Sequence, residues 1–332
     1  MQAVKETNWP LVTTIMLCYN HARFAVECLE GIKAQNYPNL ELIVNDDASR
    51  DDSASVIRDW LEKNNMPHRF LFSERNQGVC RSVNRALSHA RGKYVSGIAA
   101  DDAWLPGKLL TQVELMERLP AKVGVVYSDA LQIDEGGKLL PQRFIDAHRR
   151  FETMPTGNIH KILWEGNFIP AMTTLVRRDC YDRVGAFDEN LFYEDWDMWL
   201  RIARCFEFAY SDRVSAKYRL IGTSMVRSQF ARINQSMCQI CLKHLRGGHL
   251  EGESRRAAVL QLYNRAIYSF ECASPGHRGN LLQAARYRPS AGIALRLLLA
   301  CCGLGPGHFE RIRCLWGRAG THGAAPHSSE HA

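Results

Sequence analysis

The sequence predicts an α/β protein, built around a mostly parallel sheet that is flanked by helices. Short apolar segments alternate with segments of helical periodicity from residue 11 to about residue 100. This alternation predicts βαβ units that are joined by right-handed crossovers. Several of the apolar segments end in polar side chains, and such sheets bind ligands at the carboxyl ends of their strands. The composition agrees, because 46% hydrophobic and 23% charged residues are ordinary for a soluble globular chain of 332 residues.

The first part of the chain is expected to hold four strands and three helices. The strands are expected at residues 11–17, 40–44, 69–73 and 94–99, where short apolar runs are bounded by turn formers. The helices are expected at residues 24–34, 53–63 and 79–90, where apolar residues recur with helical spacing. Neither GxGxxG after the first strand nor GxxxxGK followed by Ser or Thr is present, which argues against an ordinary dinucleotide or P-loop site.

Polar residues follow three of these four strands. They are Tyr19 and Asn20 after the first strand, Asp46 and Asp47 after the second, and Asp101 and Asp102 after the fourth. Parallel strands would bring these three pairs together at one edge of the sheet. Adjacent buried carboxylates raise each other's pKa, and a divalent cation such as Mg2+ or Mn2+ relieves that cost. The alternative is a solvated Asp-Asp turn that only begins the helix near Pro106.

The middle of the chain continues with shorter elements. A helix is expected at residues 108–119, a strand at 123–127 and a hairpin at 130–140. Residues 143–158 have no strong period and are expected to form a mobile loop over the site. Short helices are expected at 159–164 and 181–184, with a strand at 173–177 between them.

A second acidic cluster, Glu194 and Asp195, stands at the start of a helix that continues to about residue 203. The helix dipole favours anions there, and simple helix capping is the alternative explanation. The aromatic neighbours Phe192, Trp196 and Trp199 suggest that the cluster is held against a packed wall. A carboxylate held in this way keeps a pKa suited to a general base.

The C-terminal third changes in character. Helix-like segments that are rich in Arg, Leu and Ala follow one another at residues 234–245, 255–271 and 281–302. We therefore expect an α/β domain at residues 1–225, a helical region at 226–318 and a disordered tail at 319–332. The amphipathic helices either pack on the α/β domain or lie on an anionic membrane surface.

Composition also limits the partners and the compartment. The net charge of +7 suits an anionic small molecule, a nucleic acid or an acidic membrane, but no basic run carries the interleaved aromatic residues of a nucleic-acid site. The 11 cysteines lack a framework spacing, and residues 1–10 lack the apolar core of a signal peptide, so a cytoplasmic protein is expected. Cys238 and Cys241 form a CxxC without a second ligand pair, so zinc is not expected. No apolar run reaches the roughly 18 residues of a membrane span.

Several ordered motifs resemble a known family. They are CYNH at residues 18–21, ELIVNDDASRDDS at 41–53, ERNQGVCRSVNRALSHARGKYV at 74–95, AADDAWLP at 99–106 and VGAFDENLFYEDWDMWLRIA at 184–203. In this order and spacing, between residues 11 and 219, they resemble the family 2 glycosyltransferases with the GT-A fold. The resemblance implies a nucleotide-sugar donor, with a UDP-sugar expected, and Mn2+ or Mg2+ as the divalent cation. It also implies inversion at the anomeric carbon and a saccharide or lipid-linked acceptor, as in cell-surface polysaccharide or lipopolysaccharide biosynthesis.

The resemblance assigns roles to individual residues. Those implied to line the nucleotide site are Leu17, Tyr19, Asp47, Gly78, Asn84 and Asp101. Asp102, together with Asp101, would bind the metal and the diphosphate, and Asp195 would be the general base. The chain departs from the family at Ala99 and Ala100, because many members carry an acid at the first of these positions. A nucleotidyltransferase or a catalytically inactive nucleotide-sugar-binding scaffold is the alternative, and peripheral membrane contact and oligomers are both open.

Overall fold

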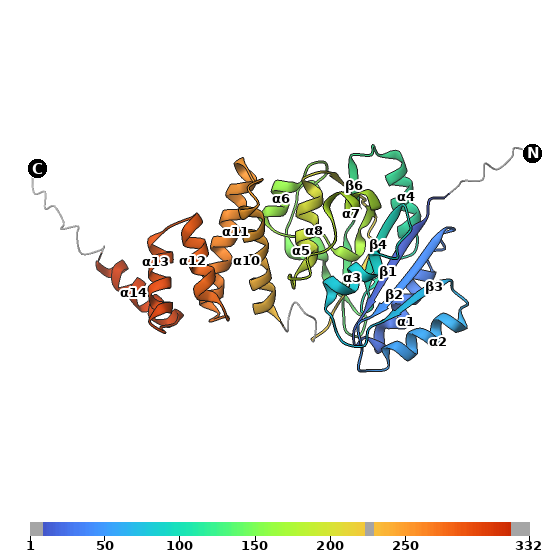
Figure 1. The fold of residues 1–332 in the computed structure, drawn as a ribbon, viewed down its shortest axis with the longest axis horizontal. Coiled ribbons are helices and arrows are strands. Elements are labelled where there is room, and N and C mark those ends of the chain that lie inside the picture. The colour runs from blue at the N-terminus through green and yellow to red at the C-terminus, as the bar shows by residue number, and fades with distance from the viewer. Residues whose placement is uncertain (1–8, 223–228, 320–332) are drawn as a thin grey trace, which may run out of the picture. The chain divides into compact units, whose positions relative to one another are not determined.

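The computed structural model describes residues 9–222 and 229–319, and the contacts divide the chain into two compact units, residues 1–228 and 229–332 (Figure 1). The first unit is the α/β part that the alternating pattern predicted, and it contains a sheet of seven strands. These strands are β1 (Val12–Cys18), β2 (Leu40–Asp46), β3 (His68–Phe72), β4 (Tyr94–Ala99), β6 (Val123–Tyr127), β9 (Leu175–Arg177) and β10 (Glu207–Tyr210). Their order across the sheet is β10-β6-β9-β4-β1-β2-β3.

The sheet is mostly parallel. Strand β1 runs parallel to both β2 and β4, while β9 runs antiparallel to β4 and β6. The register pairs Leu17 of β1 with Asn45 of β2 and with Ala99 of β4. The carboxyl ends of three adjacent strands therefore lie side by side, as the sequence predicted from their polar termini.

Helices cover both faces of this sheet. The helices of the first unit are α1 (Ala22–Lys33), α2 (Ser53–Lys63), α3 (Val79–Leu87), α4 (Lys108–Arg118), α5 (Phe144–His148), α6 (His160–Glu165), α7 (Arg178–Val184) and α8 (Glu194–Ala203). Apolar side chains of α1, α2 and α4 share one core cluster with Val12 and Met16 of β1, whereas Ala86 of α3 packs against Ile15 on the other face. Successive side chains of a strand point to opposite faces, so a covered strand must be apolar throughout.

A second, smaller sheet lies in the same unit. It contains β5 (Ala103–Trp104), β7 (Ala130–Asp134), β8 (Leu139–Arg143) and β11 (Ala216–Leu220), in the order β5-β11-β7-β8. Strands β7 and β8 form the predicted hairpin. The sequence analysis missed β5, β10 and β11, because they are short or, in the AKYRL sequence of β11, interrupted by basic residues. The position of β11 matters, since it lies beside the turn that follows β4.

Two sequence predictions need correction. Residues 143–158 were expected to be a loop throughout, but they contain α5, in which Ile145 is buried. Residues 281–302 were expected to be one helix, but the structure has two, which end and begin on either side of Pro289. Proline lacks a donor and disfavours helical geometry in the preceding residue, so it separates the two helices.

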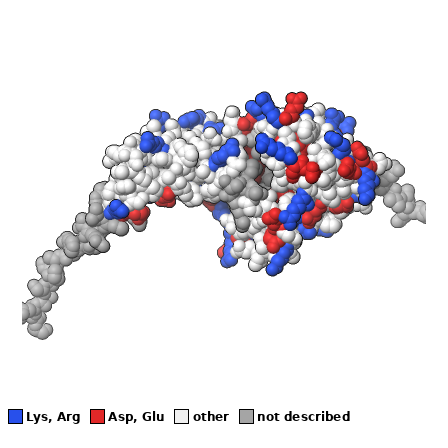
Figure 2. Space-filling model, turned by 90° about the horizontal axis from the view of Figure 1, so that it is seen from below, with Lys and Arg blue, Asp and Glu red and all other residues white. Residues whose placement is uncertain are grey.

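The second unit is helical. It consists of α10 (Phe230–Arg246), α11 (Gly252–Glu271), α12 (His277–Tyr287), α13 (Ala291–Cys301) and α14 (Pro306–Ala319). Cys238 and Cys241 are buried free thiols of α10, and burial raises the pKa of both, as befits core residues. In the face shown in Figure 2, acidic side chains gather on the first unit, while this unit presents mainly uncharged and basic side chains.

None of the helices described here is both long enough and apolar enough to cross a membrane. The predicted disordered tail lies almost wholly at residues 320–332, outside the described residues.

Candidate active site

The acidic turn, Asp101 and Asp102, follows β4 at the carboxyl edge of the large sheet. The turn is held to its neighbours by the backbone, because the N–H of Ala100 donates to the carbonyl oxygen of Leu17 at 2.8 Å. The N–H of Asp102 donates back to the carbonyl oxygen of Ala99 at 3.1 Å. The two carboxylates are thus fixed next to the end of β1, from which Tyr19 projects with 38% of its surface exposed.

Asp102 is an almost fully buried carboxylate, with 4% of its surface exposed. Its Oδ1 accepts a hydrogen bond of 2.9 Å from the backbone N–H of Arg219 in β11. Burial, followed by the negative charge of Asp101, raises the pKa of Asp102 well above its ordinary value. A cation placed beside the pair would favour its ionised form.

His21 is a site residue to which sequence reasoning assigned no role, although it lies in the CYNH motif. Its Nε2 lies 3.9 Å from Oδ1 of Asp101. Its Nδ1 is buried and has no hydrogen-bond partner among the described residues. The imidazole therefore lies beside the acidic turn through Nε2, while Nδ1 is the buried nitrogen without a partner in the described part of the chain.

The acidic turn fits a hard divalent cation that is shared with a diphosphate. The described residues contain no group of three or more His, Cys, Asp or Glu side chains that could hold a metal by themselves. Mg2+ and similar ions are commonly bound by one or two carboxylates, with substrate phosphates and water as the other ligands. Asp101 and Asp102 match that pattern, and Nε2 of His21 lies 3.9 Å from Oδ1 of Asp101.

The end of β2 shapes the neighbouring loops. The carboxylate of Asp46 accepts from the backbone N–H of Ser49 at 2.9 Å and from its hydroxyl at 2.6 Å. The carboxylate of Asp47 accepts from the N–H groups of Gln77, at 3.0 Å, and Gly78, at 2.8 Å. Gly78 has a positive φ of 88°, which suits glycine and lets the loop approach Asp47. Asp47 and Gly78 therefore do come together, and their contact with a nucleotide stays a prediction.

Asn84 lies elsewhere on α3 and has protein partners. Its Nδ2 donates to the carbonyl oxygen of Phe187 at 2.9 Å and to Glu189 at 3.2 Å, and its Oδ1 accepts from the N–H of Phe187 at 2.8 Å. The amide thus fastens α3 to the segment that leads into α8. Its predicted contact with the nucleotide stays a prediction.

Asp195 stands in the first turn of α8, half-buried, with both carboxylate oxygens engaged. Its Oδ1 accepts from the N–H of Trp196 at 2.6 Å, and its Oδ2 accepts from Nδ2 of Asn167 at 3.1 Å. The same Nδ2 donates to the hydroxyl oxygen of Tyr193 at 3.0 Å. Oδ1 of Asn167 accepts from the N–H of Ile169, which fixes the orientation of the amide. Sequence reasoning missed Asn167, because a single Asn in the segment WEGNFIP carries no signal of its own.

Two of the three aromatic neighbours that the sequence suggested as a wall, Trp196 and Trp199, are buried, whereas Phe192 is only partly buried. Trp196 is fully buried, and its indole N–H donates to the carbonyl oxygen of Leu163 at 2.7 Å. Its ring meets that of Trp164 edge-on at 5.7 Å. These contacts hold the start of α8, so the carboxylate of Asp195 has a fixed position.

Burial changes the protonation of the acidic pair. It raises the pKa of Asp195 to about 6, although the hydrogen bonds from Trp196 and Asn167 oppose the shift. Burial and then the charge of Asp195 raise the pKa of Glu194 to about 8. Near neutral pH, Asp195 can thus accept a proton while Glu194 keeps its own, which separates their roles.

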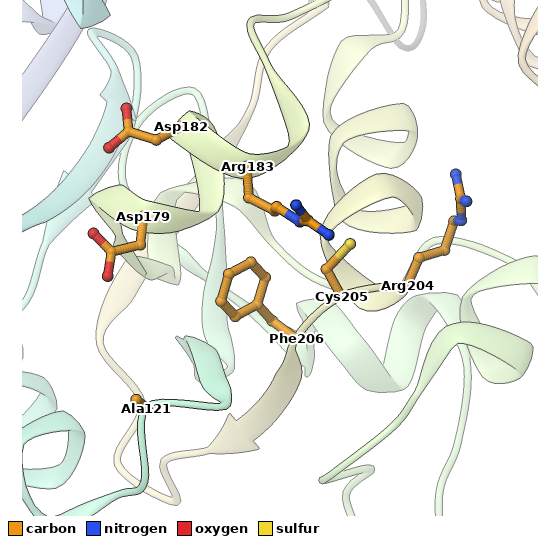
Figure 3. A pocket seen from close by; sticks show the side chains of 7 residues that line it. All are labelled: Ala121, Asp179, Asp182, Arg183, Arg204, Cys205 and Phe206. Carbon is orange, nitrogen blue, oxygen red and sulfur yellow. The ribbon is translucent and has the colours of Figure 1, made fainter.

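A hollow of about 660 Å³ lies far from this chemistry, at the amino-terminal ends of β6 and β10. Its lining consists of Ala121, Asp179, Asp182, Arg183, Arg204, Cys205 and Phe206 (Figure 3). Arg183 points toward Cys205, whereas the side chains of Arg204, Asp179 and Asp182 point away from Cys205. Ligands of such sheets bind at the opposite edge, so we place the candidate site at the acidic turn.

Comparison with known proteins identifies the family of the chain. The model of the family described as Glycosyl transferase family 2 matches residues 13–185. The chain is 28% identical to the uncharacterized glycosyltransferase RP339 of Rickettsia prowazekii, over 64% of each chain, so the match spans just under two thirds of that relative. It is 28% identical to the putative teichuronic acid biosynthesis glycosyltransferase TuaG of Bacillus subtilis, over 66% of this chain and 83% of TuaG.

Solved structures share the fold. The mannosyltransferase PcManGT from Pyrobaculum calidifontis, in complex with GDP-Man and Mn2+, superimposes with a TM-score of 0.60 at 22% identity, covering 89% of this chain and 81% of PcManGT. TarS of S. aureus, in complex with UDP, gives a TM-score of 0.56 at 16% identity, covering 81% of this chain and 74% of the TarS chain. At these identities the likeness shows the GT-A fold alone.

Proposed function

The chain belongs to glycosyltransferase family 2, and from this premise we propose that it is an inverting transferase that moves a sugar from a nucleotide-sugar donor to an acceptor hydroxyl. One observation carries the proposal. A half-buried carboxylate with a pKa raised to about 6, Asp195, and a separate acidic turn, Asp101 and Asp102, come from distant parts of one α/β unit. A base and a separate diphosphate site are the parts that a direct displacement needs.

The donor would lie along the carboxyl edge of β1, β2 and β4. The exposed ring of Tyr19, beside Leu17, offers an apolar surface to the nucleoside. The loop at Gly78, which Asp47 fastens, would border the same side. Asp101 and Asp102 would hold a divalent cation against the diphosphate, where the cation would neutralise the charge that develops on the leaving group.

The acceptor would approach Asp195. In its ionised form the carboxylate can take the proton of an acceptor hydroxyl as that oxygen attacks the anomeric carbon of the donor. The bond from the sugar to the diphosphate breaks on the opposite side, and the diphosphate leaves with the bonding electrons. A single displacement of this kind inverts the anomeric configuration. The hydrogen bonds from Asn167 and Trp196 aim the carboxylate during this step.

The relatives suggest a biological setting. TuaG is named for teichuronic acid biosynthesis, and a further relative is the putative glycosyltransferase EpsE of Bacillus subtilis. We propose a cytoplasmic enzyme of cell-surface polysaccharide synthesis, with a saccharide or lipid-linked acceptor and a UDP-sugar as donor. The basic and uncharged surface of the helical unit suits peripheral contact with the inner face of a membrane (Figure 2).

Calorimetry with the full chain tests the donor site. UDP, GDP and CDP would each be titrated with Mn2+ and with chelator. We expect one diphosphate to bind in a metal-dependent manner. The Asp102→Asn variant removes one charged contact to the cation, so its affinity should fall by tenfold or more, which corresponds to about 1.4 kcal/mol of binding free energy. Absence of metal-dependent binding by every nucleotide would contradict the donor site.

The Asp195→Asn variant tests the base. We expect it to bind the donor nucleotide as the wild type does and to lose transfer by roughly 10²-fold or more. Glu194→Gln is the matched control at the adjacent position, and it should retain most of the activity. Loss of donor binding in Asp195→Asn, or equal loss of activity in both variants, would remove Asp195 from the role of base.

A further inference from the structure

Arg219 of β11 is a buried cation beside the acidic turn, with only 2% of its surface exposed. It is 117 residues away from Asp102 along the chain. Nothing in the sequence marks it, because it stands in a short strand that does not have an alternating pattern. The smaller sheet alone brings it to the end of β4.

Arg219 contacts both residues of the acidic turn. Its backbone N–H donates to Oδ1 of Asp102 at 2.9 Å, and its side-chain Nε donates to the carbonyl oxygen of Asp101 at 2.9 Å. Its Nη1 also approaches the carbonyl oxygens of Asp134 and Glu135, each at 3.4 Å. One residue therefore holds the turn by its backbone and by its guanidinium at the same time.

The guanidinium is itself fixed from the other side. Its Nη2 pairs with the carboxylate of Glu27 in α1, and its centre lies 4.7 Å above the ring of Phe24. A planar fork is needed to reach Glu27 and the carbonyl oxygen of Asp101 together, and a lysine ammonium cannot copy that geometry. The guanidinium therefore fixes the Asp101–Asp102 turn and places a permanent positive charge beside it before any ligand binds.

We propose that Arg219 is a positioning residue that holds the Asp101–Asp102 turn in the geometry that binds a divalent cation together with a nucleoside diphosphate. This inference rests on the proposed function. The arginine touches no substrate, and it acts through the carboxylates that it holds. Its side chain contributes separately from its backbone, since a substitution at this position leaves the N–H to Asp102 in place.

The test is metal-dependent nucleotide binding by Arg219→Gln and Arg219→Lys in the full chain. Mn2+ with the diphosphate that binds the wild type is the probe, and the same nucleotide with chelator measures the metal-independent part. We expect Arg219→Gln to lose tenfold or more of the metal-dependent affinity and to keep the metal-independent affinity. Arg219→Lys, which retains the charge without the fork, should recover only part of the loss. Circular dichroism and a melting curve verify that each variant is folded at the titration temperature.

Lys217→Gln is the matched control, because Lys217 lies two residues away in β11 and its Nζ is 3.6 Å from Oε1 of Glu27. It removes the same charge from the same strand without touching the turn, so its metal-dependent affinity should equal that of the wild type. If a folded Arg219→Gln binds Mn2+ and nucleotide as the wild type does, or if Lys217→Gln loses as much, the role of Arg219 is overturned. Should Arg219→Gln not fold, full wild-type affinity in Arg219→Lys would overturn the need for the fork. Failure of the wild type to bind any nucleotide with metal would instead overturn the donor site itself.

Discussion

Asn167 donates through Nδ2 to Oδ2 of Asp195 at 3.1 Å, and its own Oδ1 is held by the N–H of Ile169 at 3.2 Å. This pairing fixes which atom of the amide faces the carboxylate. A donated hydrogen bond favours the ionised carboxylate, so it works against the burial that raises the pKa of Asp195. Asn167 therefore affects both the orientation of the Asp195 carboxylate and its pKa.

Asn167→Ala should shift the pH dependence of transfer. Removal of the donor should raise the pKa of Asp195 further above 6, by about one unit, since one hydrogen bond to a charged group contributes roughly 1.5 kcal/mol or more. Asp195 must be ionised to accept a proton, so the acidic limb of the rate profile should move to higher pH. The rate of sugar transfer, measured across the acidic and neutral range, checks this prediction. Asn190→Ala, an exposed position in the segment before α8, should leave the profile unchanged, and an unmoved limb in Asn167→Ala would refute the idea.

Glu194→Gln should change how stability depends on pH. The folded-state pKa of Glu194 is about 8, whereas the unfolded value is roughly 4.3, so folding favours the protonated acid. That stabilisation is complete below the unfolded pKa and is lost as the pH rises through the folded pKa. Between about pH 5 and pH 9, the wild type should therefore lose on the order of 4 kcal/mol more than the variant does.

Urea unfolding at several pH values measures this difference. Glu62→Gln, at an exposed position of α2, is the control and should follow the wild type at every pH. A Glu194→Gln variant whose free energy of unfolding runs parallel to that of the wild type would show that Glu194 ionises normally.

Gly92→Ala should destabilise the first unit strongly. An added Cβ would lie 2.5 Å from the backbone nitrogen of Thr13 and 2.6 Å from the carbonyl oxygen of Tyr94, and neither atom can move freely. We expect a loss of about 3 kcal/mol, typical of overpacking in a tight site. Gly97→Ala is the control in β4, where the nearest atom is 3.9 Å away, and its stability should stay within about 1 kcal/mol of the wild type. Similar melting temperatures for Gly92→Ala and the wild type would contradict the predicted clash.

The sequence predicted six of the seven strands of the large sheet and missed β10, and its central strands were the clearest because they are buried on both faces. Continuous apolar runs such as those of β1 and β6 indicate buried strands, and helical periodicity predicted the helices between them. The same reasoning missed β11 and α5, whose residues do not repeat a pattern. It also joined α12 and α13 across Pro289, where the local chemistry pointed to a break.

The candidate site was predicted only in part. Adjacent acids at strand ends are visible in a sequence, because parallel strands must place such ends side by side. Single polar residues such as His21 and Asn167 carry no such pattern. Their importance comes from the atoms that the fold places near them, at 3.9 Å from Asp101 and 3.1 Å from Asp195.

The sequence by itself determined the fold class, the strand ends that carry acids and the helix that begins at Glu194, since each of these depends on short-range periodicity. Only the tertiary structure decided which groups hold those acids. Arg219 reaches Asp102 across 117 residues through a strand that local patterns do not reveal. Long-range pairings of this kind arise from packing between sheets, and packing depends on the whole chain at once.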